Sequence, residues 1–156
     1  MLSVALEPMT DAQFGEFIEV IVPPYVAERV QADHLSPEDA QRFVRDQQDR
    51  LLPDGRQTPG HQFLRIVTLD IPQCVGGVWL EIDSENKQGF LYNLTVFPPY
   101  RRRRFGSDAL ALVAELVRRA GCGTLGLNVF ATNDAAVALY RKMGFSTVSS
   151  YMNQKL

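Results

Sequence analysis

The chain has 156 residues, of which 46% are hydrophobic and 22% charged, and this size and composition are typical of one globular domain with its own core. Its formal net charge of −2 argues against a non-specific nucleic-acid binder, which usually carries a basic excess. There is no apolar run of the roughly 20 residues that a membrane helix needs, no signal-peptide pattern at the start, and no ligand partner near either cysteine, Cys74 or Cys122. We therefore expect a cytoplasmic protein with reduced thiols and no membrane or metal partner.

The first expected element is a helix that begins after Thr10. Thr10 is followed three residues later by Gln13, which is the pattern of a capping box, and apolar residues then recur at helical spacing. Pro23 and Pro24 predict the end of this helix, because proline removes a helical hydrogen bond and clashes with the preceding turn.

Two more helices are expected in the first third of the chain. A short one is predicted over residues 25–32. The other covers residues 36–52, where Ser36 is a favoured N-cap and Pro37 suits the first helical position.

The middle of the chain changes to strand-like segments. Residues 62–70, 74–82 and 89–97 are rich in β-branched and aromatic residues, and turn residues separate them. Gly76 and Gly77 lie inside the second of these segments, which indicates a bulge or a close approach of backbone at that point.

The last third alternates between helix and strand. We expect a helix over 107–119, a strand over 124–130, a helix over 133–144 that Asn133 caps, and one or two final strands over 145–156. This order predicts a single α/β or α+β domain with a central mixed sheet.

Four consecutive arginines, Arg101 to Arg104, stand where a strand turns into a helix, and Gly106 follows them. A helix N-terminus offers unpaired N–H groups and positive dipole charge, so phosphates bind there. Three interpretations compete: a solvated basic helix start, a nucleic-acid patch, and a cradle for a phosphate-bearing cofactor. Like charges at the positive end of a helix are unfavourable without an anion, which favours the third.

With these motifs, the chain resembles the GNAT N-acetyltransferases over about residues 62 to 156. The matching positions are Val96, Pro98, Arg101 to Gly106, Asn133, Tyr140, Gly144 and Phe145. The resemblance implies a mostly antiparallel mixed sheet flanked by helices, with residues 152–156 in the last strand. It also implies one GNAT domain over 1–156, in which 1–60 form a helical acceptor-side part and 61–156 the cofactor-binding core.

The resemblance further implies that the chain transfers an acetyl group from acetyl-coenzyme A directly to a primary amine of a small molecule or peptide. The residues implied to bind the cofactor are Leu94, Thr95, Val96, Arg101, Arg102, Arg103, Arg104, Phe105, Gly106, Ser107 and Asn133. Tyr140 would be the catalytic acid that protonates the leaving thiolate; packing on the apolar helix face is its alternative role. Asn133 could likewise be a helix cap alone.

Two positions depart from the family pattern. Arg104 replaces a glycine of the phosphate-binding turn, and we expect its N–H to remain a donor if its φ is negative. Asn128 occupies the place of a glutamate that some relatives use as a base, so Glu81, His61 or a water molecule remain as candidates. Both glutamate and histidine could instead be structural.

These departures leave two other functions open. One is a GNAT-like module that binds coenzyme A without catalysis, and the other is a nucleic-acid-binding module that uses the arginines. The acceptor pocket would be lined by Tyr25, His61, Trp79 and Tyr92, although Trp79 could simply belong to the core. A homodimer is possible, and the acceptor itself is not readable.

Overall fold

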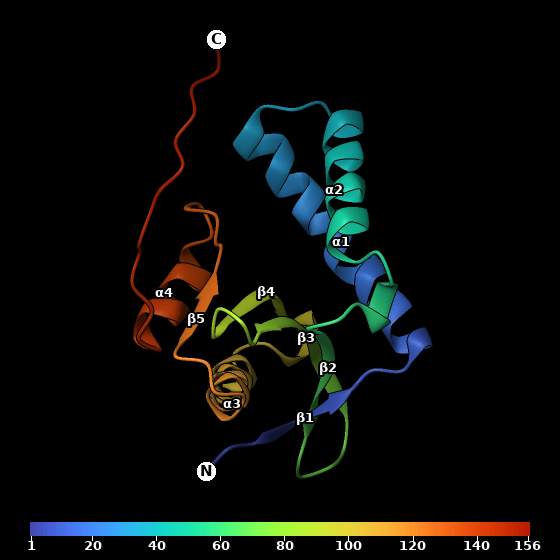
Figure 1. Cartoon of the computed structure of the whole chain (residues 1–156), viewed down its shortest axis with the longest axis vertical. Coiled ribbons are helices and arrows are strands. Elements are labelled where there is room, and N and C mark those ends of the chain that lie inside the picture. The colour runs from blue at the N-terminus through green and yellow to red at the C-terminus, as the bar shows by residue number, and fades with distance from the viewer. The chain divides into compact units, whose positions relative to one another are not determined.

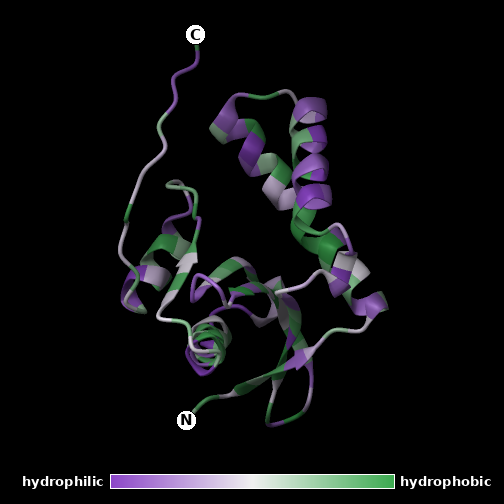
Figure 2. Ribbon diagram, in the orientation of Figure 1, coloured by the Kyte–Doolittle hydropathy of each residue, from purple (hydrophilic) through white to green (hydrophobic).

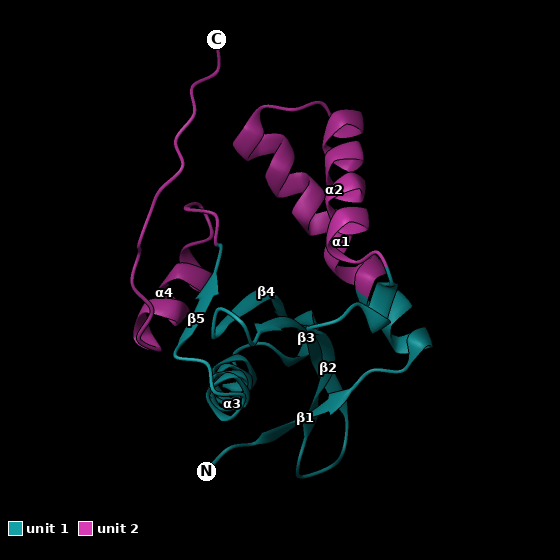
Figure 3. Ribbon diagram, viewed as in Figure 1, with its two compact units in different colours: residues 1–17, 54–128 teal, residues 18–53, 129–156 magenta.

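The computed structural model describes all 156 residues (Figure 1). The elements in chain order are β1 (Val4–Pro8), α1 (Asp11–Asp33), α2 (Pro37–Leu51), η1 (Gly55–Gln57), β2 (His61–Thr68), β3 (Cys74–Asp83), β4 (Gln88–Val96), η2 (Pro98–Tyr100), α3 (Phe105–Arg119), β5 (Thr124–Leu127) and α4 (Asp134–Lys142). They form two compact units, residues 1–17 with 54–128 and residues 18–53 with 129–156 (Figure 3). None of the helices is both long and apolar enough to cross a membrane.

The first unit contains one five-stranded sheet in the order β1-β2-β3-β4-β5. Strands β1 to β4 are antiparallel to one another in succession, and β5 at the edge runs parallel to β4. This confirms the predicted mixed, mostly antiparallel sheet flanked by helices. Strand β1 was not predicted. It has five residues and is held by pairing with β2, from Val4 with Thr68 to Pro8 with Leu64.

Helix α3 covers one face of this sheet. Leu110, Val113 and Val117 on α3 are almost completely buried, and Figure 2 shows hydrophobic and hydrophilic residues together on this helix. A methyl group at Gly89 of β4 would lie 2.6 Å from a methyl carbon of Val117. The helix can therefore pack closely only because this position has no side chain.

The first turns of α1 cover the opposite face at Gly77. A Cβ there would lie 2.5 Å from the ring of Phe17 and 2.9 Å from the methyl group of Met9, and a Cβ at Gly76 would collide with the carbonyl of Thr95. The register also shifts beside Gly76, where Val75 is bulged. Both parts of the prediction for the glycine pair, a bulge and a close approach, are confirmed.

In the second unit, α1 continues through Pro23 and Pro24 to Asp33. The predicted end at the prolines and the separate helix over 25–32 are therefore wrong. The prolines cannot donate to the carbonyls of Glu19 and Val20, four residues earlier. Both of those residues are exposed, so water can reach the carbonyls that lose their helical partners.

The predicted helix caps are confirmed. Thr10 and Gln13 form the reciprocal capping box, with N–H to side-chain oxygen distances of 2.9 and 3.2 Å. The Ser36 hydroxyl accepts from Asp39 N–H at 3.1 Å. Asn133 caps α4 by accepting from Ala136 N–H at 3.2 Å.

The C-terminal segment 145–156 contains no strand, so the final strands expected there, including the one over 152–156, are not formed. Val148, Tyr151 and Met152 are 83 to 95% exposed, and a lone extended segment without a pairing partner does not make a strand. The segment is held near Ala32, whose carbonyl accepts from the Asn153 side chain at 2.8 Å. β5 is also shorter than predicted, because it ends at Leu127.

Candidate functional site

The parallel pairing of β4 with β5 stops halfway along β4. It joins Gln88 to Leu91 with β5, whereas Leu94, Thr95 and Val96 pair only with β3. The change occurs at Tyr92, an extra residue that lies between the pairs Leu80–Leu91 and Trp79–Asn93. Such a bulge bends the strand. The second half of β4 therefore has a free backbone edge on its β5 side.

The free edge presents groups that an extended, amide-rich ligand could pair with. Phe97 N–H donates to Val75 in β3 at 2.8 Å, so by strand alternation the backbone groups of Val96 and Leu94 point to the free edge. The side chain of Arg101 confirms this direction, because its Nε–H donates to the Val96 carbonyl at 2.9 Å. The N–H groups of Leu94 and Val96 and the carbonyl of Leu94 remain available on this edge.

The loop between η2 and α3 bends the backbone back and forth. φ is +64° at Arg102 and +69° at Arg104 but not positive at Arg103. Alternation of this kind turns successive N–H groups toward one concave side and makes an anion-binding nest. Arg104 therefore does not have the negative φ that we took as the condition for its N–H to remain a donor. It adopts the left-handed conformation that a glycine would adopt, at a cost of roughly 1–2 kcal/mol.

The N-terminus of α3 continues this nest. Its first helical hydrogen bond runs from Asp108 N–H to the Arg104 carbonyl at 3.0 Å, which leaves the N–H groups of Phe105, Gly106 and Ser107 without helical partners. The unpaired N–H groups of the loop and of the first turn of α3 thus follow one another along the chain at the positive end of the helix, where anions bind favourably.

The arginine side chains leave the loop strongly positive. Arg102, Arg103 and Arg104 are exposed, and none has a carboxylate within 4.0 Å. The nearby Asp108 is engaged by Ser3, whose N–H and hydroxyl donate to it at 2.9 and 2.6 Å. Desolvation acts to raise the pKa of Asp108, but these hydrogen bonds and the charge of Arg104 hold that pKa below its ordinary value. The structure thus joins three guanidinium groups and a backbone nest in one loop.

Asn133 and Tyr140 belong to the second unit. Asn133 caps α4. The Tyr140 ring packs edge-on against Phe145, with ring centroids 5.6 Å apart, and burial raises the pKa of its phenol. Tyr140 therefore holds its proton firmly at neutral pH. Tyr25, the other predicted residue of this unit, donates its hydroxyl to Gln47 at 2.8 Å.

A second cluster of predicted residues lies on the face of the sheet opposite α3. Glu81 is its carboxylate: the Tyr92 hydroxyl donates to Oε1 at 3.1 Å, and Nε2 of His61 lies 3.4 Å from Oε2. Trp79 donates its indole N–H to Nδ1 of His61 at 2.9 Å. These four residues are called the Glu81 network below. The sequence analysis named all four, but the spacing of residues 79 and 81 on one strand face was the only hint that they meet.

The hydrogen bonds of the Glu81 network define its protonation. Because the indole N–H can only donate, Nδ1 of His61 must be an acceptor, so the proton of the neutral ring is on Nε2 and points to Glu81. Burial lowers the pKa of His61 against the opposing charge of Glu81, which keeps the ring neutral. Burial and the charge of Glu81 raise the pKa of Tyr92 to about 12. In this arrangement His61 has no free lone pair with which to act as a base.

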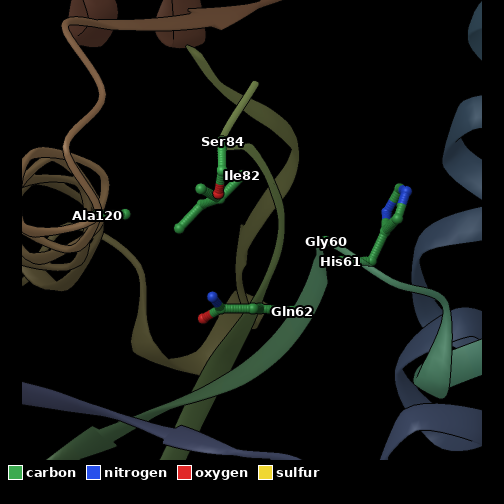
Figure 4. Close-up of a pocket in the computed structure, with 6 residues that line it drawn as sticks. All are labelled: Gly60, His61, Gln62, Ile82, Ser84 and Ala120. Carbon is green, nitrogen blue, oxygen red and sulfur yellow. The ribbon is translucent and has the colours of Figure 1, made fainter. Parts of the chain in front are cut away.

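An open hollow lies elsewhere on the first unit, and no charged side chain lines it. Its residues are Gly60, His61, Gln62, Ile82, Ser84 and Ala120. Figure 4 shows the His61 side chain pointing away from the other lining residues. The hollow therefore shares only His61 with the Glu81 network, and it lacks a charged side chain with which to bind a phosphate.

Comparisons with known proteins show the family and the fold of this chain. The model described as "Acetyltransferase (GNAT) family" matches residues 25–145. The chain is 32% identical to the uncharacterized N-acetyltransferase YycN of Bacillus subtilis (strain 168), over 99% of this chain and 100% of that protein. The crystal structure of YycN matches with a TM-score of 0.91 at 31% identity, over 99% of both chains.

A more distant relative has a named acceptor. The [ribosomal protein bS18]-alanine N-acetyltransferase of Escherichia coli (strain K12) is 36% identical over 63 residues, which are 40% of this chain and 43% of that protein. The similarity thus covers less than half of either protein.

Proposed function

Because this chain belongs to the acetyltransferase (GNAT) family, we propose that it transfers an acetyl group from acetyl-coenzyme A directly to a primary amine of a small molecule or peptide. Members of this family are N-acetyltransferases, and the chain is an acyltransferase enzyme by this membership. The free edge of β4, followed at once by a positively charged nest at the start of α3, is the observation that carries the cosubstrate proposal.

The phosphates of the cosubstrate would be held by the loop and the start of α3. The N–H groups between Arg102 and Ser107 would donate to the pyrophosphate, and the unpaired guanidinium groups would neutralise its charge. The side chains of Arg102, Arg103 and Arg104 are exposed, so a bound anion can reach all three. Binding of an anion would reduce the electrostatic repulsion between these three cations and the positive end of the helix, which supports a phosphate site here.

The amide-rich arm of the cosubstrate would extend along the free edge of β4. Leu94 would donate and accept, and Val96 would donate, whereas Thr95 points its backbone groups toward β3. When bound, acetyl-coenzyme A supplies a thioester whose C–S bond breaks as the C–N bond to the amine forms. A backbone N–H of this edge would stabilise the charge that develops on the carbonyl oxygen.

Tyr140 would return a proton to the departing sulfur. Its pKa is raised by burial, so the phenol is protonated at neutral pH and can supply the proton. Because the thiol that forms has an ordinary pKa of about 8.5, this transfer is uphill by itself, and it is completed when the phenolate takes up the proton that the amine loses as the C–N bond forms. Asn133 would contact the cosubstrate in addition to capping α4.

The proposal is tested first by thermal melting with acetyl-coenzyme A, with ATP as an unrelated phosphate compound. Acetyl-coenzyme A at 100 times its dissociation constant should stabilise the protein by about 2.7 kcal/mol. The double variant Arg102→Ala with Arg103→Ala should lose most of this effect, whereas Arg118→Ala with Arg119→Ala, at the far end of α3, should keep it.

Turnover is tested by release of free thiol across a panel of amines. Thiol released above the amine-free background supports acetyl transfer. A protein that binds acetyl-coenzyme A but releases no thiol with any amine would instead be a binding module, and a protein that ATP stabilises equally would argue against a dedicated cosubstrate site.

A further inference from the structure

Glu81 keeps an uncompensated negative charge on the face of the sheet opposite α3. No Lys or Arg side chain lies within 4.0 Å of its carboxylate. Arg65, which lies on the same face of β2, is instead paired with Glu7 at 2.6 Å. The charge of Glu81 is therefore open to a cationic ligand.

The two groups that hold the carboxylate are both neutral. Tyr92 donates an O–H to the carboxylate, and the neutral ring of His61, which the indole of Trp79 fixes, presents Nε2 3.4 Å from Oε2. These groups orient the carboxylate without cancelling its charge. The Glu81 side chain is 34% exposed, whereas that of His61 is only 4% exposed, so a ligand can reach the acid but not the imidazole.

A cluster of aromatic rings lies on the same face of the sheet and reaches Glu81 through Tyr92 and His61. The ring of Tyr92 lies 4.6 Å from that of Trp79, 4.6 Å from that of Phe90 and 5.6 Å from that of His61, measured between centroids. The rings of Phe63 and Trp79 are stacked at 5.4 Å. Phe63 and Trp79 are buried, whereas Phe90 and Tyr92 are partly exposed, so these two rings can offer aromatic surface to a cation beside the carboxylate, which adds charge and a hydrogen-bond acceptor. Together they match an ammonium group joined to an apolar body.

The Glu81 network lies next to the point where the free edge of β4 begins, which is where the acetyl group would be transferred. Tyr92, which donates to Glu81, is the bulged residue at which β4 parts from β5 and its free edge begins. Gly89 and Leu91 of β4 face α3, and Phe90 faces the opposite side with Glu81, its partner across the strands. A cosubstrate on the free edge would thus be approached by the acceptor from the face that carries the Glu81 network.

We propose that Glu81 binds the ammonium form of the acceptor against the neighbouring aromatic rings, so that the substrates are cationic primary amines with an apolar or aromatic body. This inference rests on the proposed acetyl transfer and names the substrate class of that same site. His61 is a positioning residue here: it acts through Glu81 and does not touch the acceptor.

Intrinsic fluorescence gives a direct test, because Trp79 is the single tryptophan of the chain and belongs to the Glu81 network. The probe is 2-phenylethylamine, which is an ammonium ion at pH 7.5, and its neutral counterpart is 2-phenylethanol. The amine should change the fluorescence saturably and bind more tightly than the alcohol.

Variants of the acid then separate charge from fold. Glu81→Gln should weaken binding of the amine about tenfold or more, since a charge-assisted hydrogen bond is lost, and should leave the alcohol unaffected. Glu81→Asp, which keeps the charge, should recover part of the loss. Glu85→Gln removes the same charge from the adjacent exposed turn and should bind the amine as the unaltered protein does.

Failure of this inference is distinguishable from failure of the proposed function. No saturable response to the amine, or equal binding by the Glu81→Gln variant, overturns the amine site. Stabilisation by acetyl-coenzyme A is measured on the same variants and should be unchanged. If acetyl-coenzyme A does not stabilise even the unaltered protein, the proposed function fails whatever the amine titration shows.

Discussion

Trp79 donates its indole N–H to Nδ1 of His61 at 2.9 Å and thereby fixes the tautomer of the neutral ring, whose Nε2 lies 3.4 Å from Glu81. One hydrogen bond thus decides which of two candidate proton acceptors has a free site. The Nδ1 lone pair of the buried imidazole is occupied by the indole N–H, whereas the carboxylate of Glu81 stays partly exposed.

The free energy of unfolding should decrease as the pH falls below about 6.5, because His61 then becomes protonated in the unfolded chain. The pKa of His61 is lowered from its ordinary value of 6.5 by burial, with Glu81 opposing the shift. The folded state then binds fewer protons than the unfolded chain, so this contribution to stability is fully present above pH 6.5 and declines as pH falls from 6.5 through the lower folded pKa. Unfolding free energies measured between pH 5 and 8, by urea titration, check this.

The control for that pH series is His61→Gln, which cannot titrate in this range. Its stability should lack the part of the decline that His61 causes. A decline of the same size in both proteins would show that other groups are responsible.

Replacement of Arg104 by glycine should stabilise the folded protein, whereas replacement of Arg103 should not. Arg104→Gly removes the cost of a left-handed arginine, roughly 1–2 kcal/mol before the entropy of glycine is subtracted. Arg103, whose φ is not positive, has no such strain, so Arg103→Gly should be destabilising. Urea unfolding of the two variants should therefore rank Arg104→Gly above Arg103→Gly by about 1 kcal/mol. The reverse order would contradict the assigned conformations.

Gly89 should not tolerate even a methyl group. Gly89→Ala places a Cβ 2.6 Å from Val117, and the resulting overpacking should cost about 1–3 kcal/mol of unfolding free energy. Gly15→Ala is the matched control, because Gly15 lies within α1 and a Cβ there meets nothing within 4 Å. It should be neutral or stabilising by up to about 1 kcal/mol. Equal effects of the two substitutions would contradict close packing of α3 on β4.

Asn133 allows its two roles to be separated. Asn133→Ala should cost about 1 kcal/mol because the N-cap of α4 is lost, whereas Asn133→Ser keeps a capping oxygen and should retain stability. If the amide also contacts the cosubstrate, the serine variant will bind acetyl-coenzyme A more weakly although it is stably folded. Unchanged affinity in that variant would leave Asn133 as a cap alone.

Tyr140→Phe tests the proposed acid. The ring packing against Phe145 would be kept, so the melting temperature should change little. Loss of the proton donor should lower kcat by about 100-fold or more and leave the KM for acetyl-coenzyme A nearly unchanged. A variant with an unchanged kcat would show that Tyr140 has only a packing role.

Local sequence was sufficient wherever the deciding interactions are local. The capping box of Thr10 with Gln13 and the caps at Ser36 and Asn133 involve residues within three positions of one another. The same holds for the turn from β4 through the arginines into α3, whose position the sequence predicted; that this loop binds an anion stays a prediction. Gly76 and Gly77 likewise indicated a bulge or close contact before any partner was known.

Only the tertiary structure decided features that depend on distant partners. Pro23 and Pro24 are compatible with a continuous α1 because Glu19 and Val20, the residues whose carbonyls they leave unpaired, are exposed. The segment 145–156 has strand-like residues but forms no strand, since a strand exists only where a second one pairs with it. The Glu81 network depends on the register of β2, β3 and β4 and on the bulge at Tyr92. The sequence by itself determined which groups are available, and the pairing of strands far apart in the chain decided which of them meet.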